Sequence, residues 1–199
     1  MELLNTLFEN LYNFHFENND AFKKLLYGRV ELENATALLH FSKQSLVQDL
    51  LHNLKYRGHE QIGKFLGDWL GGELNTLEAY QTIDVVVPVP IHKKSKRERG
   101  YNQVTKFGEQ IAKALNTEYF ENALIKTSYT KRQVFKDRVT RFEDVNKRFE
   151  IGDTNNLSNK HILLVDDVIT TSATIEACII LLQTIPGVKI SVATMAIVE

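Results

Sequence analysis

From residue 83 onward, the pattern of hydrophobic and polar positions predicts strands that are each followed by a helix. Short runs of β-branched residues and leucine, typical of strands buried on both faces of a parallel sheet, occur at 83–89 and 162–165. Apolar residues recur at helical spacing in 102–115 and 173–184, which predicts two helices. This order predicts an α/β fold, with a mostly parallel sheet flanked by helices.

The rest of the chain completes this layout and divides it into two parts. Further strands are expected at 36–41, 123–129 and 189–198, and further helices at 1–16, at 45–56, around 62–70 and at 141–147. Gly71 and Gly72 are expected to end the helix around 62–70, because glycine is common just after a helix. Residues 1–35 are predicted to form a helical N-terminal appendage, and residues 36–199 the main domain.

Composition narrows the classes of function. The hydrophobic share of 43% and the charged share of 25% are ordinary for a globular protein. Lys and Arg number 24 against 25 Asp and Glu, so the net charge of -1 gives no global argument for binding nucleic acid or a membrane. Any electrostatic function must be local. The single cysteine, Cys178, excludes an internal disulfide and a thiolate zinc cluster built by this chain alone, and its helical position predicts a small core residue.

Nothing in the sequence indicates a membrane partner. No apolar run approaches the ~20 residues of a membrane span, and the first residues lack a basic region followed by an apolar stretch and a cleavage site. The amphipathic pattern at 1–16 has glutamates beside it, which anionic lipid would repel. We expect a cytoplasmic protein whose first helix packs on its own domain or on a partner.

Two adjacent acids and a hydroxyl-rich turn follow the strand at 162–165. Asp166 and Asp167 are expected where that strand leaves the sheet, and ligands of open α/β sheets bind there. Four hydroxyl residues come next, at the start of the helix: Thr170, Thr171, Ser172 and Thr174. The free N–H groups of a helix start attract a phosphate, and the hydroxyls add donors. The acids suit a neighbouring polyol or a metal ion, so the layout predicts a site for a phosphorylated sugar.

A basic segment, residues 92–100, follows the strand at 83–89. Runs of this kind are usually solvated surface, but this one begins at the sheet edge where ligands bind. A mobile basic loop there can receive a polyphosphate, because Arg offers forked donors and Lys a compact charge. Gly100 to Gln103 then open the next helix, which is a second candidate anion site.

Other interpretations of these motifs have weaker support. The segment 58–65, GHEQIGKF, resembles a nucleotide-binding phosphate loop, but Phe65 replaces the metal-binding hydroxyl and the segment follows a helix. The acids lie too close to the C-terminus for a receiver domain. The histidines show no zinc-hydrolase pairing, and no nucleophile elbow is present. The acids and hydroxyls could simply cap the helix, but a cap explains one polar side chain and not two acids with four hydroxyls.

Together these residues resemble the type I phosphoribosyltransferases, and more narrowly the ComF/GntX family of phosphoribosyltransferase-like proteins, which are linked to DNA uptake in competent bacteria. Three blocks carry the resemblance: SLVQDLLHNLKYRGH at 45–59, VVPVPIHKKSKRERGYNQ at 86–103 and LLVDDVITTSATIEA at 163–177. A fourth block at 133–151 matches through Gln133, Arg138, Arg141, Asn146 and Phe149. The resemblance covers about residues 36–199 and implies a type I phosphoribosyltransferase-like domain with a small hood.

The resemblance implies roles for these residues. Asp166 and Asp167 would contact the ribose hydroxyls, directly or through Mg²⁺, and would act in catalysis together with Arg99. The 5'-phosphate loop would comprise Val168, Ile169, Thr170, Thr171, Ser172, Ala173 and Thr174. The pyrophosphate side would comprise Pro88, Val89, Pro90, Lys93, Lys94, Lys96, Arg97, Arg99 and Gly100. The hood over the acceptor base would include Gln133, Arg138, Arg141 and Asn146.

Two departures from the family pattern affect these expectations. Family members often begin with a four-cysteine zinc ribbon, whereas residues 1–40 contain no cysteine, so no zinc is expected. Ser172 stands where the phosphate loop usually has glycine. If that position needs a positive φ, serine adds strain of about 1 kcal/mol, although its hydroxyl could contact the phosphate.

Two functions follow from the resemblance. The first is Mg²⁺-dependent transfer of a phosphoribosyl group between phosphoribosyl pyrophosphate and a nitrogenous acceptor, in either direction. The second is a non-catalytic accessory role in competence or DNA uptake, in which the pocket senses a ligand and the basic segment contacts single-stranded DNA or a competence protein. The sequence names neither the acceptor nor the oligomeric state.

Overall fold

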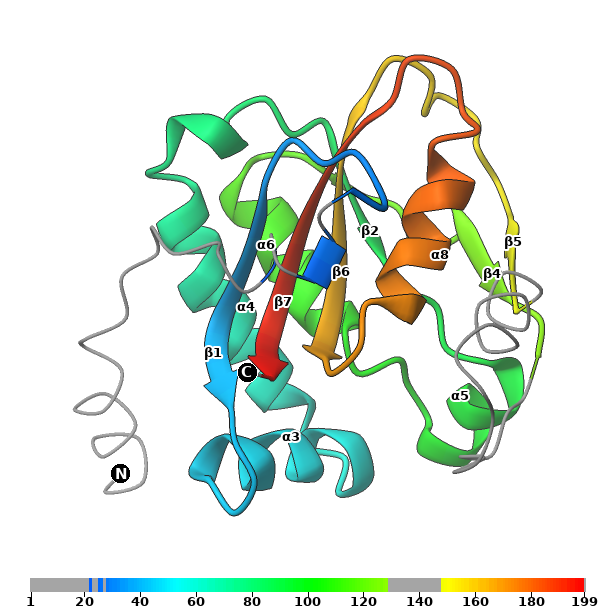
Figure 1. Cartoon of the computed structure of the whole chain (residues 1–199). Helices are drawn as coiled ribbons and strands as arrows, with labels where there is room; N and C mark the ends of the chain where they lie inside the picture. The colour runs from blue at the N-terminus through cyan, green and yellow to red at the C-terminus, as the bar shows by residue number, and fades with distance from the viewer. Residues whose placement is uncertain (1–21, 23–24, 27, 129–147, 199) are drawn as a thin grey trace.

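Within residues 22, 25, 26, 28–128 and 148–198, which the structure describes, five parallel strands form the central sheet of this computed structural model (Figure 1). Their order across the sheet is β1-β7-β6-β2-β3. The strands are β1 (Ala35–Phe41), β2 (Val85–Pro88), β3 (Glu118–Tyr119), β6 (His161–Ile169) and β7 (Lys189–Val198). All four pairings between neighbours are parallel, so the predicted α/β class is confirmed.

Helices cover both faces of this sheet. The helices are α3 (Leu46–Tyr56), α4 (Glu60–Leu74), α5 (Lys93–Arg99), α6 (Thr105–Ala114) and α8 (Ala173–Leu182), with a 3-10 turn at Glu78–Tyr80; α5 buries none of its residues and covers neither face. Helices α3, α4 and α6 pack on one face. Helix α8 packs on the other face, beside a small antiparallel sheet of β4 (Leu124–Lys126) and β5 (Phe149–Ile151) (Figure 1).

Strand β6 shows why helices must cover both faces of the sheet. Ile162 and Leu164 pack in the cluster that contains α8, whereas Leu163 and Val165 pack in the cluster that contains α4 and α6. Successive side chains of a strand point to opposite faces, so a continuous apolar run is buried on both. Cys178 on α8 is fully buried in the first cluster.

The chain reverses its direction across the sheet between β2 and β6. From β2 it passes through α6 to β3 on one side, and from β6 through α8 to β7 on the other. The pairing of β6 with β2 ends at Val165, opposite Pro88, whereas its pairing with β7 continues to Ile169. In open α/β sheets this kind of reversal marks the ligand site, at the carboxyl ends of the two strands.

Several elements differ from the sequence predictions. The predicted strand at 123–129 does not join the central sheet; its central part is β4, which pairs with β5. The sheet edge is instead taken by β3, whose two residues are too few to give a recognisable pattern. The predicted helices at 1–16 and 141–147 lie outside the described residues. Strands β1 and β7 and helices α3, α6 and α8 agree with the predictions apart from shifts at their ends.

Gly71 and Gly72 do not end α4, which continues to Leu74. The reason is close packing against α6. A Cβ atom at Gly71 would lie 2.7 Å from the Cβ of Ala114, and one at Gly67 would lie 2.5 Å from the carbonyl oxygen of Phe107. These glycines let two helix backbones approach each other, so they belong to a helix interface and not to a helix end.

The segment before β1 also packs on the main core. Phe22 and Leu26 are buried in the cluster that contains α8, and the backbone N–H of Glu33 donates to the carbonyl of Ile190 on β7. Among the described residues, no helix is long and apolar enough to cross a membrane.

The α4–α6 interface gives a stability prediction. Gly67→Ala should lower the free energy of unfolding by about 1–3 kcal/mol, because its Cβ would overlap the backbone of Phe107. Gly72→Ala is the matched control on the same helix: nothing lies within 4 Å of its added Cβ, so better helix propensity should raise stability by about 0.5–1 kcal/mol. Urea unfolding of both variants measures the difference, and equal effects would contradict this packing argument.

Candidate functional site

Asp166 and Asp167, the acid pair, lie in the last part of β6. The strand runs further than predicted, so both acids are still within it and Asp166 is opposite Thr194 of β7. They are almost buried, with exposed fractions of 9% and 5%. Because strand side chains alternate, Asp166 faces the side of α8 and β4, and Asp167 faces the side of α3 and α6.

Asp167 is held by donors from three directions. Its Oδ2 atom accepts a hydrogen bond of 2.7 Å from Nε2 of Gln103 and lies 3.0 Å from Nζ of Lys55. Its Oδ1 atom accepts from the backbone N–H of Val168 at 2.6 Å. Lys55 lies in the last turn of α3, and Gln103 lies between α5 and α6. A nearly buried carboxylate is stable only with such partners.

A further hydrogen bond links the acid pair to the basic segment. Arg99, the last residue of α5, donates from Nη1 to Oε1 of Gln103. Its guanidinium carbon also lies 5.7 Å from the ring centroid of Tyr56. A cavity of about 220 Å³ adjoins these groups and is lined by Lys55, Tyr56, Gly58, Ser95, Glu98 and Arg99. Gln103 therefore links Arg99 to Asp167, two of the residues that the sequence predicted for the site.

Asp166 has a different environment. Burial raises the pKa of its carboxyl to about 7, and the negative charge of Asp167 acts in the same direction. The backbone N–H of Asp167 donates to Oδ1 of Asp166 at 2.8 Å, and the positive charges of Lys55 and Lys126 oppose the shift. Lys126 comes from β4, where burial lowers the pKa of its amine and the charge of Asp166 opposes that change. Near neutral pH, Asp166 can therefore hold a proton beside its partner.

The basic segment is not the predicted loop but contains the two-turn helix α5. His92 caps its start, where Nδ1 accepts from the backbone N–H of Lys94 at 3.1 Å, and Gly100 ends it with a φ of 91°. Four basic side chains of the helix are exposed: Lys93, Lys94, Lys96 and Arg97. Lys96 pairs with Glu121 at 2.7 Å. Most of the positive charge of α5 therefore faces solvent, and only Arg99 turns inward to the acid pair.

The residues just before and just after α5 make contacts within the protein. Pro88 ends β2, and Val89 and Pro90 are buried. Asn102 donates from Nδ2 to the carbonyl of Val89 at 3.1 Å, which ties the strand end to the start of α6. Helix α6 begins only at Thr105. The expectation that residues 100–103 open this helix as an anion site is therefore wrong, because Asn102 and Gln103 are buried and bound within the protein.

The phosphate turn, residues 168–174, runs from the end of β6 into α8. Val168 and Ile169 still belong to β6, Thr170 and Thr171 are exposed, and Ala173 begins the helix. Ser172 has a φ of −66°, in the right-handed helical region. The strain that a positive φ would have caused is therefore absent at this position, and serine fits the turn as well as glycine does.

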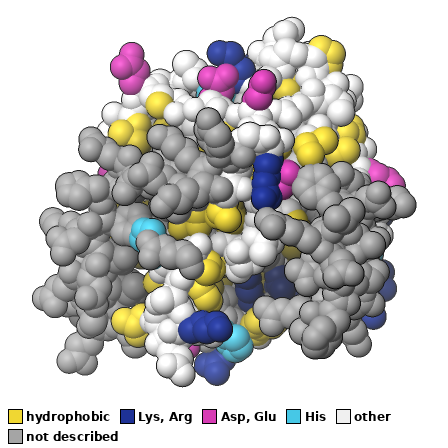
Figure 2. Space-filling model, viewed as in Figure 1, with side chains coloured by type: hydrophobic (Ala, Val, Ile, Leu, Met, Phe, Trp, Pro, Cys, Tyr) yellow, Lys and Arg dark blue, Asp and Glu magenta, His cyan; other side chains and the backbone are white. Residues whose placement is uncertain are grey.

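Charge is distributed unevenly over the visible surface. On the face shown in Figure 2, Lys and Arg side chains gather mainly in the lower half, toward which β1, β6 and β7 point in Figure 1. Asp and Glu side chains on that face lie mainly in the upper half. Among the described side chains on this face, positive charge is therefore more frequent toward the end of the sheet that carries the phosphate turn.

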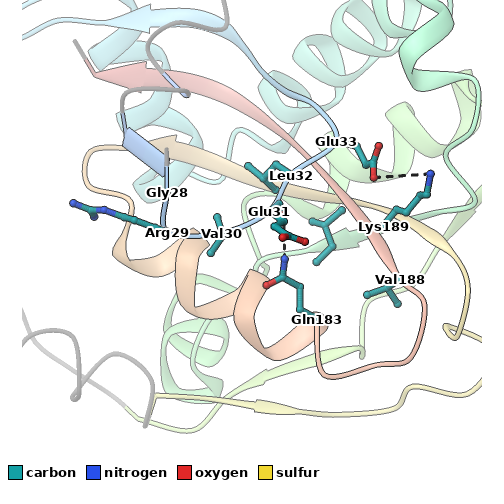
Figure 3. Close-up of a pocket in the computed structure, with 10 residues that line it drawn as sticks. Gly28, Arg29, Val30, Glu31, Leu32, Glu33, Gln183, Val188 and Lys189 are labelled. Carbon is teal, nitrogen blue, oxygen red and sulfur yellow. Dashed lines mark hydrogen bonds and ion pairs between the residues drawn. The ribbon is translucent and has the colours of Figure 1, made fainter.

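A larger cavity of about 720 Å³ lies elsewhere, at the start of β7 and the end of α8 (Figure 3). Its lining includes Leu32, Gln183 and Val188, and Lys189 pairs with Glu33 across 3.9 Å. Gln183 follows the end of α8 and Lys189 begins β7, so these lining residues lie at the other end of α8 from the phosphate turn. Arg29 borders it, but its side chain points away from the other labelled residues (Figure 3).

The acid pair is also the natural place to test for Mg²⁺. Among the described residues, no group of three or more His, Cys, Asp or Glu side chains is arranged to hold a metal ion. Mg²⁺ typically keeps several waters and uses one or two carboxylates together with substrate phosphates. The two acids fit that mode, in which the ion arrives with a phosphorylated ligand, but Asp167 would have to exchange Lys55 or Gln103 for direct contact.

The remaining predicted residues lie elsewhere. Gln133, Arg138, Arg141 and Asn146, the predicted hood, lie outside the described residues. Lys55 was missed by sequence reasoning as a contact of Asp167, and Gln103 was expected only at the start of the next helix. Lys55 and Gln103 fall inside the blocks that carry the family resemblance, so that resemblance was the available signal for them.

Comparisons with known proteins agree with the motifs. The chain is 27% identical over 131 residues to DNA utilization protein YhgH of Escherichia coli (strain K12), which covers 63% of the chain and 56% of that protein. It is 27% identical over 94 residues to competence protein F of Haemophilus influenzae, covering 47% of the chain and 41% of that protein. The chain thus spans about half the length of the curated relatives it matches. These similarities confirm the resemblance to ComF proteins, although no family model matches the chain.

Among solved structures, the chain is loosely similar to phosphoribosyltransferases. Adenine phosphoribosyltransferase from Trypanosoma brucei, in complex with AMP, pyrophosphate and ribose-5-phosphate, gives a TM-score of 0.48 and 15% identity over 82% of this chain and 71% of that one. Glutamine phosphoribosylpyrophosphate amidotransferase from B. subtilis gives 0.46 and 20% over 67% and 26%. Since both likenesses are loose, the fold assignment above rests on strand order and pairing.

The buried acid predicts a pH dependence. Burial raises the pKa of Asp166 to about 7, so between about pH 4 and pH 7 the unfolded chain loses this proton while the folded protein keeps it. The contribution of Asp166 to wild-type stability should therefore fall across that window and stay lower above it. Asp166→Asn should therefore raise the free energy of unfolding by about 1–3 kcal/mol at pH 8 and have little effect below about pH 4.

Urea unfolding between these pH values measures the effect. Asp167→Asn is the control, because it gives up the ion pair with Lys55 and should show no gain at pH 8. A difference between Asp166→Asn and wild type that does not change with pH would contradict the prediction.

Proposed function

We propose that the chain binds phosphoribosyl pyrophosphate at the carboxyl ends of β2 and β6 and transfers its phosphoribosyl group to or from a nitrogenous acceptor. The observation that carries this proposal is the contact series from Asp167 through Gln103 to Arg99. It joins an acid suited to sugar hydroxyls with a cation suited to pyrophosphate, beside a turn suited to a phosphate. The names of the relatives concern DNA utilization and competence, and supply no reaction for this chain.

In this proposal, the hydroxyls, the 5'-phosphate and the pyrophosphate of the ligand each bind a different part of the site. The ribose hydroxyls donate to Asp166 and Asp167. The 5'-phosphate accepts from the backbone N–H groups of the phosphate turn and from Thr170 and Thr171, which are exposed there. The pyrophosphate lies toward Arg99, at the cavity that Lys55 also lines. In this arrangement Lys55 leaves Asp167 and turns to the leaving group, a movement that its flexible stem allows.

The reaction breaks the bond between ribose C1 and the pyrophosphate oxygen, and the bonding electrons leave with pyrophosphate. A lone pair on a nitrogen of the acceptor then forms the new bond to C1, and the proton that this nitrogen carried leaves to solvent or to the departing pyrophosphate. The ribose ring gains positive charge in the transition state, and the acid pair on one side and the cations on the other stabilise the charges that separate. Mg²⁺ bound with the pyrophosphate would supply further positive charge to the leaving group.

Calorimetry tests this ligand directly. Wild type should bind phosphoribosyl pyrophosphate in the presence of Mg²⁺, and the double variant Asp166→Asn/Asp167→Asn should bind at least about tenfold more weakly, because amides replace both carboxyl groups that accept from the ribose hydroxyls. Asp68→Asn/Asp153→Asn is the matched control, since it removes two exposed acids on α4 and after β5. Absence of binding by wild type, or equal affinity for all three proteins, would refute the proposal.

A second candidate function is binding of single-stranded DNA, with ligand sensing in place of catalysis. It is favoured by the exposed basic face of α5 beside an exposed aromatic pair on α3. The Tyr56 side chain is 68% exposed, and its ring centroid lies 4.9 Å from that of His52. Basic side chains that follow a phosphate backbone, with aromatic rings on which bases stack, are the usual elements of such a surface.

Anisotropy of a labelled single-stranded oligonucleotide, measured across salt concentrations, tests the second candidate. Wild-type affinity should fall with salt, and Lys93→Gln/Arg97→Gln should reduce the slope by about 0.7 for each phosphate that the variant no longer neutralises. Lys64→Gln/Lys113→Gln removes two exposed cations from α4 and α6 and should leave the slope unchanged. No binding, or equal slopes for all three proteins, would exclude this role for α5.

A further inference from the structure

Three side chains form a closed set of polar contacts beneath the phosphate turn. Arg29, from the segment before β1, donates from Nη1 to Oγ of Ser172 at 2.9 Å. The same Nη1 atom lies 3.5 Å from Oε2 of Glu176, in the first turn of α8. Ser172 in turn donates its hydroxyl to Oε2 of Glu176 at 3.4 Å. Arg29 and Ser172 are 143 positions apart in the sequence.

Glu176 places a buried carboxylate at the start of α8, where the phosphate is proposed to bind. Only 2% of the residue is exposed, and it lies in the helical turn whose free N–H groups would hold the 5'-phosphate. A buried acid there is favoured by the helix dipole but repels a second anion at the same helix start. The guanidinium of Arg29, 42% exposed, is the cation placed against it. The phosphate turn therefore contains a built-in negative charge with its own counter-charge.

We propose that Arg29 is a positioning residue for the phosphate turn: it neutralises Glu176 and fixes Ser172, so that the start of α8 can accept the phosphate of a sugar phosphate. This inference rests on the proposed function. The oxygen of Ser172 accepts from Arg29 while its proton goes to Glu176, so this hydroxyl serves the three-residue set and not the phosphate. The segment before β1 thereby becomes part of the site.

The electrostatic role makes a distinctive prediction about combined variants. Arg29→Gln leaves Glu176 charged beneath the turn and should weaken binding of ribose 5-phosphate by about tenfold or more. Glu176→Gln removes the repelling charge and should bind at least as tightly as wild type. The double variant lacks both charges and should return to within about threefold of wild-type affinity. A purely structural role for Arg29 predicts no such recovery.

The test is calorimetry with ribose 5-phosphate and without metal, combined with thermal unfolding of each variant. Lys160→Gln is the control, since it removes a cation that pairs with Asp84 at the opposite end of β6. Arg29→Gln binding like wild type would overturn the inference, as would a double variant as weak as Arg29→Gln. If Arg29→Gln does not fold, a loss of affinity in Glu176→Gln still overturns it. No binding of ribose 5-phosphate by wild type would also overturn this inference, whereas the proposed function fails only if wild type does not bind phosphoribosyl pyrophosphate with Mg²⁺.

Discussion

The site depends on the reversal of chain direction between β2 and β6. Because the two connections leave in opposite directions, β6 loses its partner on one side after Val165 while β7 still holds it as far as Ile169. The acid pair lies in that half-paired stretch. Its backbone is therefore fixed by a strand, while groups from α3 and the segment after α5 act on Asp167 and a group from β4 acts on Asp166, from opposite faces of the sheet. A loop could present the same two acids, but without this rigidity.

Two adjacent buried carboxylates need hydrogen-bond donors or positive charges close to them, and Asp167 has more of these partners than Asp166. Asp167 has Lys55, Gln103 and a backbone N–H within hydrogen-bonding distance. Asp166 accepts from the backbone N–H of Asp167, and the charge of Lys126 acts on it without removing the effect of burial, so its pKa is raised. Two acids of the same type thus differ through their surroundings, a separation that proton-transfer and sugar-binding sites commonly use.

The sequence predicted features formed by neighbouring residues and missed contacts between residues that are far apart in the chain. The strands and the longer helices follow from hydrophobic periodicity, and the acid pair with its turn is one continuous motif. Helix α5 could not be recognised in this way, because none of its residues is buried and its ends are set by His92 and Gly100. Contacts such as Gln103 with Asp167, across 64 positions, depend on how the layers pack. The glycines of α4 carried a signal, but close packing and helix termination use the same residue type.

Those glycines connect the packing of the helices to the chemistry of the site. Lys55 can reach Asp167 only if the end of α3 lies close to β6, and α3 packs beside α4 on the same face of the sheet. A Cβ at Gly63 would touch both the carbonyl of Gln103 and the side chain of Leu54, the neighbour of Lys55. Tyr101 donates to the carbonyl of Leu54 from the segment after α5. The overlaps that a Cβ would cause at Gly67 and Gly71 therefore set how closely α6 approaches α4, and Gln103, two residues before α6, meets the carboxylate that Lys55 also contacts.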